Sequence, residues 1–142
     1  MGFANKLVVA GMLLCVQPAW SHPLEGSWQF VSGEYFTPQG DFKAQAPQIS
    51  STKVISAGHF NYVTRKNGAF HYAAGGRYEI TDTQFIEYID YGNIPSLLNK
   101  RLAFDFELIG DVWHHRLFEQ GKLVEYEIWR RSDASSQKKA PK

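Results

Sequence analysis

The sequence predicts an all-β fold, an antiparallel barrel of about eight strands that is closed or nearly closed. Two observations lead to this prediction. Short segments in which apolar and polar residues alternate recur along the chain, as expected for strands that bury one face. Turn signals rich in Gly, Asn and Asp separate them at roughly ten-residue spacing, which is typical of antiparallel barrels and sandwiches. Closing such a sheet removes edges that would otherwise pair with other chains.

Strands and turns follow one another in order along the chain. The clearest strand is 102–108, where apolar residues alternate strictly with small or acidic ones. Turns are indicated at 66–68, 110–111 and 120–122, because Gly and Asn tolerate a positive φ. The expected strands span residues 28–31, 53–56, 60–64, 70–72, 76–80, 83–91, 102–108, 112–119 and 123–131.

Three segments are expected to differ from this strand pattern. Residues 94–100 (IPSLLNK) are locally helical and short. Residues 37–48 contain two prolines, and we expect a long mobile loop near a mouth of the barrel. Residues 132–142 form a polar tail that is expected to be disordered.

Residues 1–21 have the pattern of a secretory signal peptide. Lys6 is the only charged residue of this segment, and an apolar run follows it at 7–16. Ala19 and Ser21 place small residues three and one positions before a cleavage site that follows Ser21. The apolar run is too short to be a permanent membrane span. We therefore expect a periplasmic or secreted protein with no stable membrane anchor.

Cleavage would remove Cys15, the only cysteine. A lipid anchor there is not expected, because Leu14 precedes it where a lipoprotein signal needs a small residue. The mature chain would then hold no disulfide, thiolate nucleophile or cysteine-based metal site. Its length suits a single domain, 22–131, built around one core.

The charge and motif content exclude several function classes. The chain carries 15 basic and 14 acidic side chains, so it lacks the dense positive field that nucleic acid binding requires. A phosphate-binding loop, a dinucleotide fingerprint and a nucleophile elbow are all absent from the sequence. We therefore expect neither nucleic acid as a partner nor a cofactor.

The first strand opens on Gly26-Ser27-Trp28, and the last ends on Trp129-Arg130-Arg131. Gly-x-Trp at the first strand of an exported all-β domain resembles the signature of lipocalins and other calycins. That resemblance implies that Trp28 closes the floor of the barrel beneath a basic residue of the last strand. Either Arg130 or Arg131 could cover the indole, an interaction of about 0.5–2 kcal/mol.

A closer resemblance covers nearly the whole mature chain. It rests on Leu24-x-Gly26-x-Trp28, Lys53-Val54-Ile55 with His59-Phe60, Gly75-Gly76-x-Tyr78, Glu87-Tyr88 and Glu127-x-Trp129-x-Arg131. Together these motifs resemble bacterial exported lipocalin-like domains of uncharacterised function. The resemblance implies the barrel, and it brings no catalytic residues.

Alternation along the strands places two glutamates among apolar neighbours. Glu87 lies between apolar residues of its own face, and Glu127 shares a face with Trp129. A carboxylate in such surroundings must be hydrogen-bonded, paired or protonated. Arg116, His114 and His115 lie on the strand between and could be partners. Two interpretations stay open: an ion pair that fixes strand register, or a polar anchor in an apolar ligand pocket.

The expected role is binding of a small, partly apolar molecule in the barrel interior. Carboxylates would hold its polar head, and aromatic side chains would hold its apolar body. The candidate ligand-binding residues are Tyr78, Glu87, Phe104, Phe106, His115, Arg116 and Glu127.

No metal site is expected from the histidines. His114 and His115 are adjacent on one strand and must face opposite sides, and the sequence leaves open which one faces inward. A three-histidine zinc site would need His59, His71 and one of that pair to converge.

Two alternatives to ligand binding remain. A calycin-type enzyme could use interior groups for acid–base chemistry, with Tyr62, Tyr78, Tyr88, Arg77 and Glu87 as its material. A ligand-free barrel could instead form a homodimer. The broken alternation of 113–118 puts apolar residues on both faces of that strand, as a subunit interface would require.

Overall fold

The structure is a computed structural model that describes residues 22–132. The expected signal peptide, and the expected tail beyond Ser132, lie outside the described residues. Within them, nine strands form one antiparallel sheet. The strands are β1 (Gly26–Thr37), β2 (Gly40–Gln45), β3 (Ile49–Ser56), β4 (His59–Lys66), β5 (Ala69–Ile80), β6 (Gln84–Gly92), β7 (Arg101–Ile109), β8 (Val112–Glu119) and β9 (Lys122–Arg131), with a short 3₁₀ helix η1 (Pro95–Leu97) between β6 and β7.

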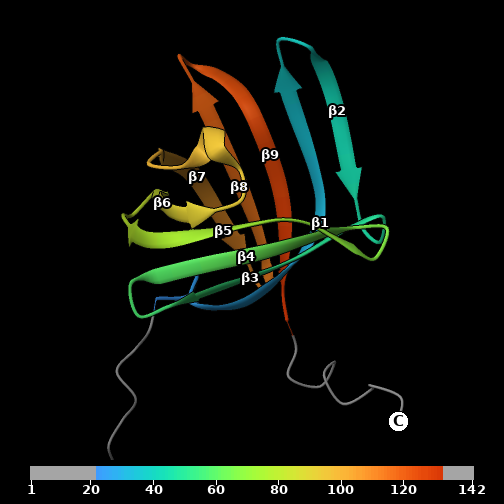
Figure 1. Ribbon diagram of the computed structural model, residues 1–142. Coiled ribbons are helices and arrows are strands. Elements are labelled where there is room, and N and C mark those ends of the chain that lie inside the picture. The colour runs from blue at the N-terminus through green and yellow to red at the C-terminus, as the bar shows by residue number, and fades with distance from the viewer. Residues whose placement is uncertain (1–21, 133–142) are drawn as a thin grey trace, which may run out of the picture.

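The sheet closes on itself through β1. This strand pairs with β3 through residues 26–29 and with β9 through residues 28–35. Eight strands therefore form a closed antiparallel barrel, as predicted, and β2 is an additional strand beside β1. In Figure 1 the β1–β2 hairpin rises together with β9 at one end, and β3, β4 and β5 cross below it.

The prediction of a loop over residues 37–48 is wrong. β1 continues to Thr37, and Gly40–Gln45 pairs with it as β2. Pro38 and Pro47 lie in the turns on either side of β2, where no ladder hydrogen bond is needed from proline. The stacked rings of Tyr35 and Phe42, 4.8 Å apart between centroids, join the two strands.

The expected strands 70–72 and 76–80 are one continuous strand, β5. Its pairing with β6 shifts register between Gly75 and Gly76, which is the signature of a β-bulge. A side chain at Gly76 would collide with the backbone oxygen of Tyr88. Glycine is therefore required there by the close approach of the neighbouring strand.

The floor of the barrel is built as the Gly-x-Trp resemblance implies. Trp28 is 0% exposed, and its indole nitrogen donates a 2.8 Å hydrogen bond to the carbonyl of Leu24. The guanidinium carbon of Arg131 lies 4.3 Å from the centroid of the Trp28 ring, and Arg130 is exposed. Gly26 has a φ of 125°, and a Cβ there would come within 3.1 Å of the Arg131 guanidinium. Arg131 is thus the residue that covers the floor.

Candidate functional site

A cavity of about 730 Å³ occupies the barrel interior above the aromatic core. Its exposed lining residues, such as Pro38, Phe42 and Lys122, come from the turn regions of the β1–β2 and β8–β9 hairpins. Its buried lining residues include Lys53 and Glu87 from β3 and β6. The cavity therefore runs from a mouth at the hairpin end to a polar group of side chains deep in the barrel.

Lys53 and Glu87 form a buried ion pair at the inner end of the cavity. The Lys53 Nζ lies 2.7 Å from Oε1 of Glu87, and each side chain is 3% exposed. The ammonium also lies 4.9 Å from the ring centroid of Trp129 and 5.3 Å from that of Trp113, a range typical of cation–π contacts. The positive charge is therefore compensated by Glu87 and enclosed by aromatic faces.

Glu127 is the most heavily hydrogen-bonded group of the cavity. Its Oε1 accepts a 2.6 Å hydrogen bond from the Tyr35 hydroxyl, and its Oε2 accepts a 2.8 Å bond from the Trp129 indole N–H. Nδ1 of His115 lies 3.4 Å from Oε2. Burial alone would raise the pKa of Glu127, but the His115 hydrogen bond, the Lys53 charge and the Tyr35 hydroxyl outweigh burial and lower it. Glu127 is thus held as a carboxylate.

His115 is a neutral, fully enclosed imidazole. Burial, and next the nearby Lys53 charge, lower its pKa, although the bond to Glu127 acts in the opposite sense. Its ring lies 3.7 Å from the Phe104 ring between centroids. Because a carboxylate only accepts, the contact with Glu127 puts the imidazole proton on Nδ1, which leaves Nε2 as an acceptor. Nε2 is buried and has no hydrogen-bond partner in the described part of the chain.

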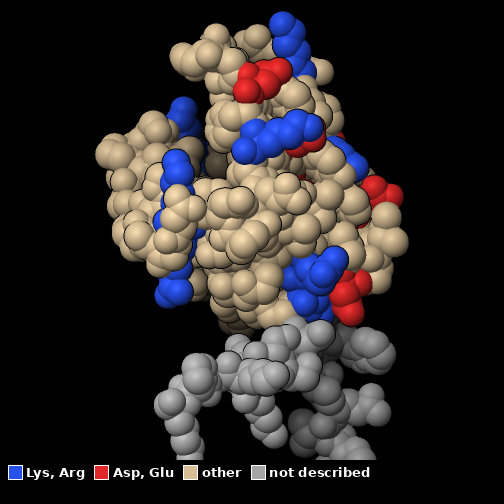
Figure 2. Space-filling view, turned by 90° about the vertical axis from the view of Figure 1, so that its right-hand side faces the viewer, with Lys and Arg blue, Asp and Glu red and all other residues tan. Residues whose placement is uncertain are grey.

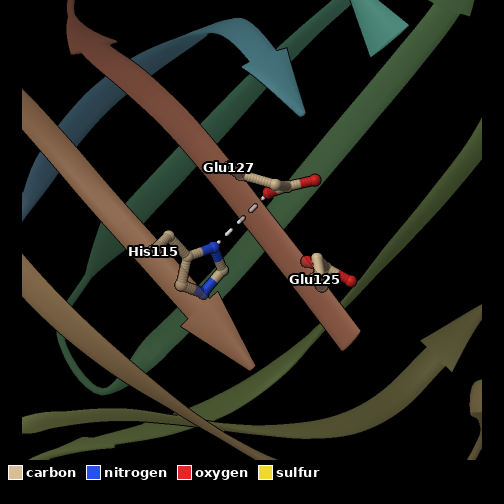
Figure 3. Close-up of side chains that lie close together, drawn as sticks. All are labelled: His115, Glu125 and Glu127. Atoms are coloured by element: carbon tan, nitrogen blue, oxygen red, sulfur yellow. Dashed lines mark hydrogen bonds and ion pairs between the residues drawn. The ribbon is translucent and has the colours of Figure 1, made fainter. Parts of the chain in front are cut away.

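Glu125 lies two residues before Glu127 on β9 and faces the same cavity. Figure 3 shows its carboxyl beside the imidazole of His115 and the carboxyl of Glu127, on the same side of the sheet. Among residues 22–132 it makes no hydrogen bond or ion pair, unlike its neighbour. Burial, and next the charge of Glu127, raise its pKa well above the ordinary value. Glu125 is therefore a carboxyl group that faces the cavity without a hydrogen-bond or ion-pair partner among the described residues.

The structure brings four of the seven candidate residues to the cavity: Glu87, Phe104, His115 and Glu127. Tyr78 and Phe106 point to the opposite, closed end of the barrel. The Tyr78 hydroxyl donates a 2.5 Å hydrogen bond to Glu25, and the Phe106 ring packs 6.0 Å from that of His22 between centroids. Both residues belong to the packing near the floor, and neither lines the cavity.

Arg116 lies on the outer wall, so the prediction that it partners the interior carboxylates is wrong. It faces Glu107 at 3.7 Å and stacks over the Tyr126 ring at 4.7 Å. Neighbours on a strand face opposite sides, and His115 takes the inward position. The interior cation is Lys53. It lies two residues from both Ser51 and Ile55, so alternation along the strand places its side chain on the same inward face.

The residues named for the enzyme interpretation and for a three-histidine zinc site do not come together at one place in the structure. Of the proposed acid–base material, only Tyr62 and Glu87 line the cavity, whereas Arg77 is exposed and pairs with Asp90 at 2.9 Å. His59 and His71 are also exposed and lie apart from His115. The broken alternation near Phe118 coincides with a register shift in the pairing of β8 with β9. A bulge thus explains that pattern within a single chain.

One metal-ligating group does occur within the described residues. His115, Glu125 and Glu127 each offer a ligand atom, and these atoms lie within 4.8 Å of one another. Both oxygens of Glu127 already accept hydrogen bonds, from Tyr35 and from Trp129. A metal ion would have to share these oxygens with the two donors.

The outer surface carries no large field of one sign on the face seen in Figure 2, where basic and acidic groups are scattered across uncharged surface. Residues 22–132 contain no helix long and apolar enough to cross a membrane.

The chain was compared with family models and with curated proteins, and none of them matches it. The architecture itself is compatible with a lipocalin-like barrel.

Proposed function

We propose that this protein is an exported lipocalin-like barrel that binds a small, partly apolar molecule in its interior. The observation that carries the proposal is the cavity of about 730 Å³ inside the closed barrel. Small-ligand sites are concave, mostly apolar and equipped with a few fixed polar groups, and this volume is within their usual range.

The lining has the two parts that such a site needs. Apolar and aromatic side chains, including Phe36, Leu102 and Phe104, provide a surface for an apolar body. The hydrogen bonds around Glu127 and the pairing of Lys53 hold the polar groups in fixed positions. A ligand would therefore meet a largely preformed site and would not have to order it.

A neutral fluorophore, N-phenylnaphthylamine, tests whether the cavity binds apolar molecules. We expect saturable binding to the mature protein, with an increase in fluorescence. Leu117→Trp should weaken binding because it places a larger side chain on the cavity wall. Val63→Trp is the matched control, because Val63 is exposed and absent from the cavity lining. Absence of saturable binding, or equal weakening by both variants, would overturn the proposal.

Export is supported by the signal-peptide pattern of residues 1–21. Native mass spectrometry of protein purified from its own host would test export and binding together. The expected mass is that of a chain beginning at His22 plus one bound molecule, and denaturation should release that molecule. A chain retaining residues 1–21, or a lipid on Cys15, would refute the export proposal. The same spectrum gives the number of subunits.

A further inference from the structure

The internal hydrogen bonds of the cavity leave acceptors without donors. The Tyr35 hydroxyl and the Trp129 N–H are already used by Glu127, and the Lys53 ammonium is used by Glu87. The Glu125 carboxyl receives nothing from any described residue. On the same wall, Nε2 of His115 is a buried acceptor that also lacks a donor. Both unmet requirements are for a group that donates hydrogen bonds.

The charges of the lining point in the same direction. Five carboxyl side chains and two ammonium groups line the cavity from mouth to inner end: Asp41, Glu87, Glu119, Glu125 and Glu127 against Lys53 and Lys122. Lys53 is enclosed and paired, so it is not free to bind a ligand anion. Carboxyl groups therefore outnumber ammonium groups in the cavity lining, although the chain as a whole is nearly balanced.

The geometry suits one cationic nitrogen. Carboxyl oxygens of Glu125 and Glu127 lie within 4.8 Å of one another. A nitrogen with two N–H groups, each about 2.8–3.0 Å from its acceptor, can bridge that separation. Glu127 accepts three donors, and a carboxylate has about four acceptor positions, so it can accept one more.

We propose that the ligand is an organic amine, an ammonium group on an apolar or aromatic body, and that Glu125 binds the ammonium with Glu127 beside it. This inference rests on the proposed function and specifies the ligand class of the same cavity. The aromatic lining contributes as well, because the faces of Tyr62, Tyr72 and Phe104 attract a cation and pack against a ring. Glu125 is a recognition residue in this proposal, and no reaction step is assigned to it.

A matched set of probes distinguishes the ligand class. Naphthylethylamine, naphthylethanol and naphthylacetate share one apolar body and differ in the charge of the head. Titration at neutral pH should show the amine binding at least about tenfold more tightly than the alcohol, the scale of one charged hydrogen bond. The acetate should bind most weakly. An alcohol or acetate that binds as tightly as the amine would overturn the inference.

Two variants locate the effect. Glu125→Gln keeps the size of the side chain and removes its charge, so the amine should lose its advantage over the alcohol. Glu119→Gln removes an exposed carboxylate at the mouth of the same cavity and should keep that advantage. Thermal melts of both variants verify that they fold. If Glu125→Gln retains the preference for the amine, the assignment of Glu125 is wrong.

The experiment separates this inference from the proposed function. If the alcohol and N-phenylnaphthylamine bind but the amine shows no advantage, only the ligand class fails. If none of the probes binds, both proposals fail. Stoichiometric Zn²⁺ binding at micromolar concentration, lost in Glu125→Gln and competing with the amine, would overturn the inference by assigning the group to a metal.

Discussion

The Nζ of Lys53 and the Oε1 of Glu87 lie 2.7 Å apart inside the barrel, although β3 and β6 are not neighbours in the sheet. The pair spans the interior from one wall to the other. Glu87 had two possible roles in the sequence, an ion-pair partner or a ligand anchor. The observed contact gives it the first role, and we propose Glu125 in its place as the ligand anchor.

Breaking this pair should destabilise the protein strongly. Lys53→Met or Glu87→Gln leaves one charge buried without its partner, at an expected cost of about 3–5 kcal/mol in the free energy of unfolding. The double variant Lys53→Met/Glu87→Leu should recover most of that loss, because neither charge remains. Urea unfolding of the three variants measures the effect. A Glu87→Gln protein as stable as the wild type would show that the pair contributes little.

The floor of the barrel gives a second stability prediction. Trp28→Ala should cost about 3–5 kcal/mol, as for other buried aromatic truncations. Arg131→Ala should cost less, about 0.5–2 kcal/mol for the cation–π contact. Arg130→Ala is the control, since Arg130 is exposed, and its unfolding midpoint should match the wild type. Equal losses for the two arginine variants would contradict the assignment of Arg131 to the floor.

The alternation of apolar and polar residues predicted which face of the sheet a side chain occupies. It did not predict how deep in the barrel that side chain lies. Glu87, Glu127 and Phe104 face inward as expected, because period-two burial is a local property of each strand. Tyr78 and Phe106 are displaced toward the floor. Their depth depends on the tilt and stagger of the closed barrel, which no single strand encodes.

The sequence pattern could not predict which side chains meet across the barrel interior. The Lys53–Glu87 contact exists only because the sheet closes, so no spacing along the chain indicates it. Glu125 and Glu127 are two residues apart on β9, so alternation places both on the same face. The difference between them arises from donors on other strands, Tyr35 on β1 and His115 on β8, which bond Glu127 and leave Glu125 without a partner.

Glu125→Gln should stabilise the unliganded protein at neutral pH. The pKa of Glu125 is raised in the folded state by burial and by Glu127, so folding favours the protonated carboxyl. Its contribution to stability is therefore present below the ordinary pKa of 4.5 and is lost as the pH rises through the folded value. The variant should exceed the wild type at pH 7, and the gap should narrow towards pH 4. A variant that is less stable than the wild type at pH 7 would contradict this sign.

Acid should destabilise the Glu125→Gln protein through two groups with lowered pKa values. Burial and Lys53 lower the pKa of His115, so the unfolded chain takes up its proton first as the pH falls below the ordinary value of 6.5. The lowered pKa of Glu127 has the same consequence below its ordinary value of 4.5.

The free energy of unfolding should therefore fall in two steps as the pH falls, the first below 6.5 and the second below 4.5. The Glu125→Gln background is needed because the raised pKa of Glu125 acts with the opposite sign in the same range. Urea unfolding from pH 7 to pH 3 gives the profile. His71→Gln, at an exposed histidine, should leave the first step unchanged. His115→Gln should remove that step, because it removes the buried imidazole whose pKa is lowered. Retention of the first step in His115→Gln would assign it to another group and would contradict the description of His115 as a buried neutral imidazole.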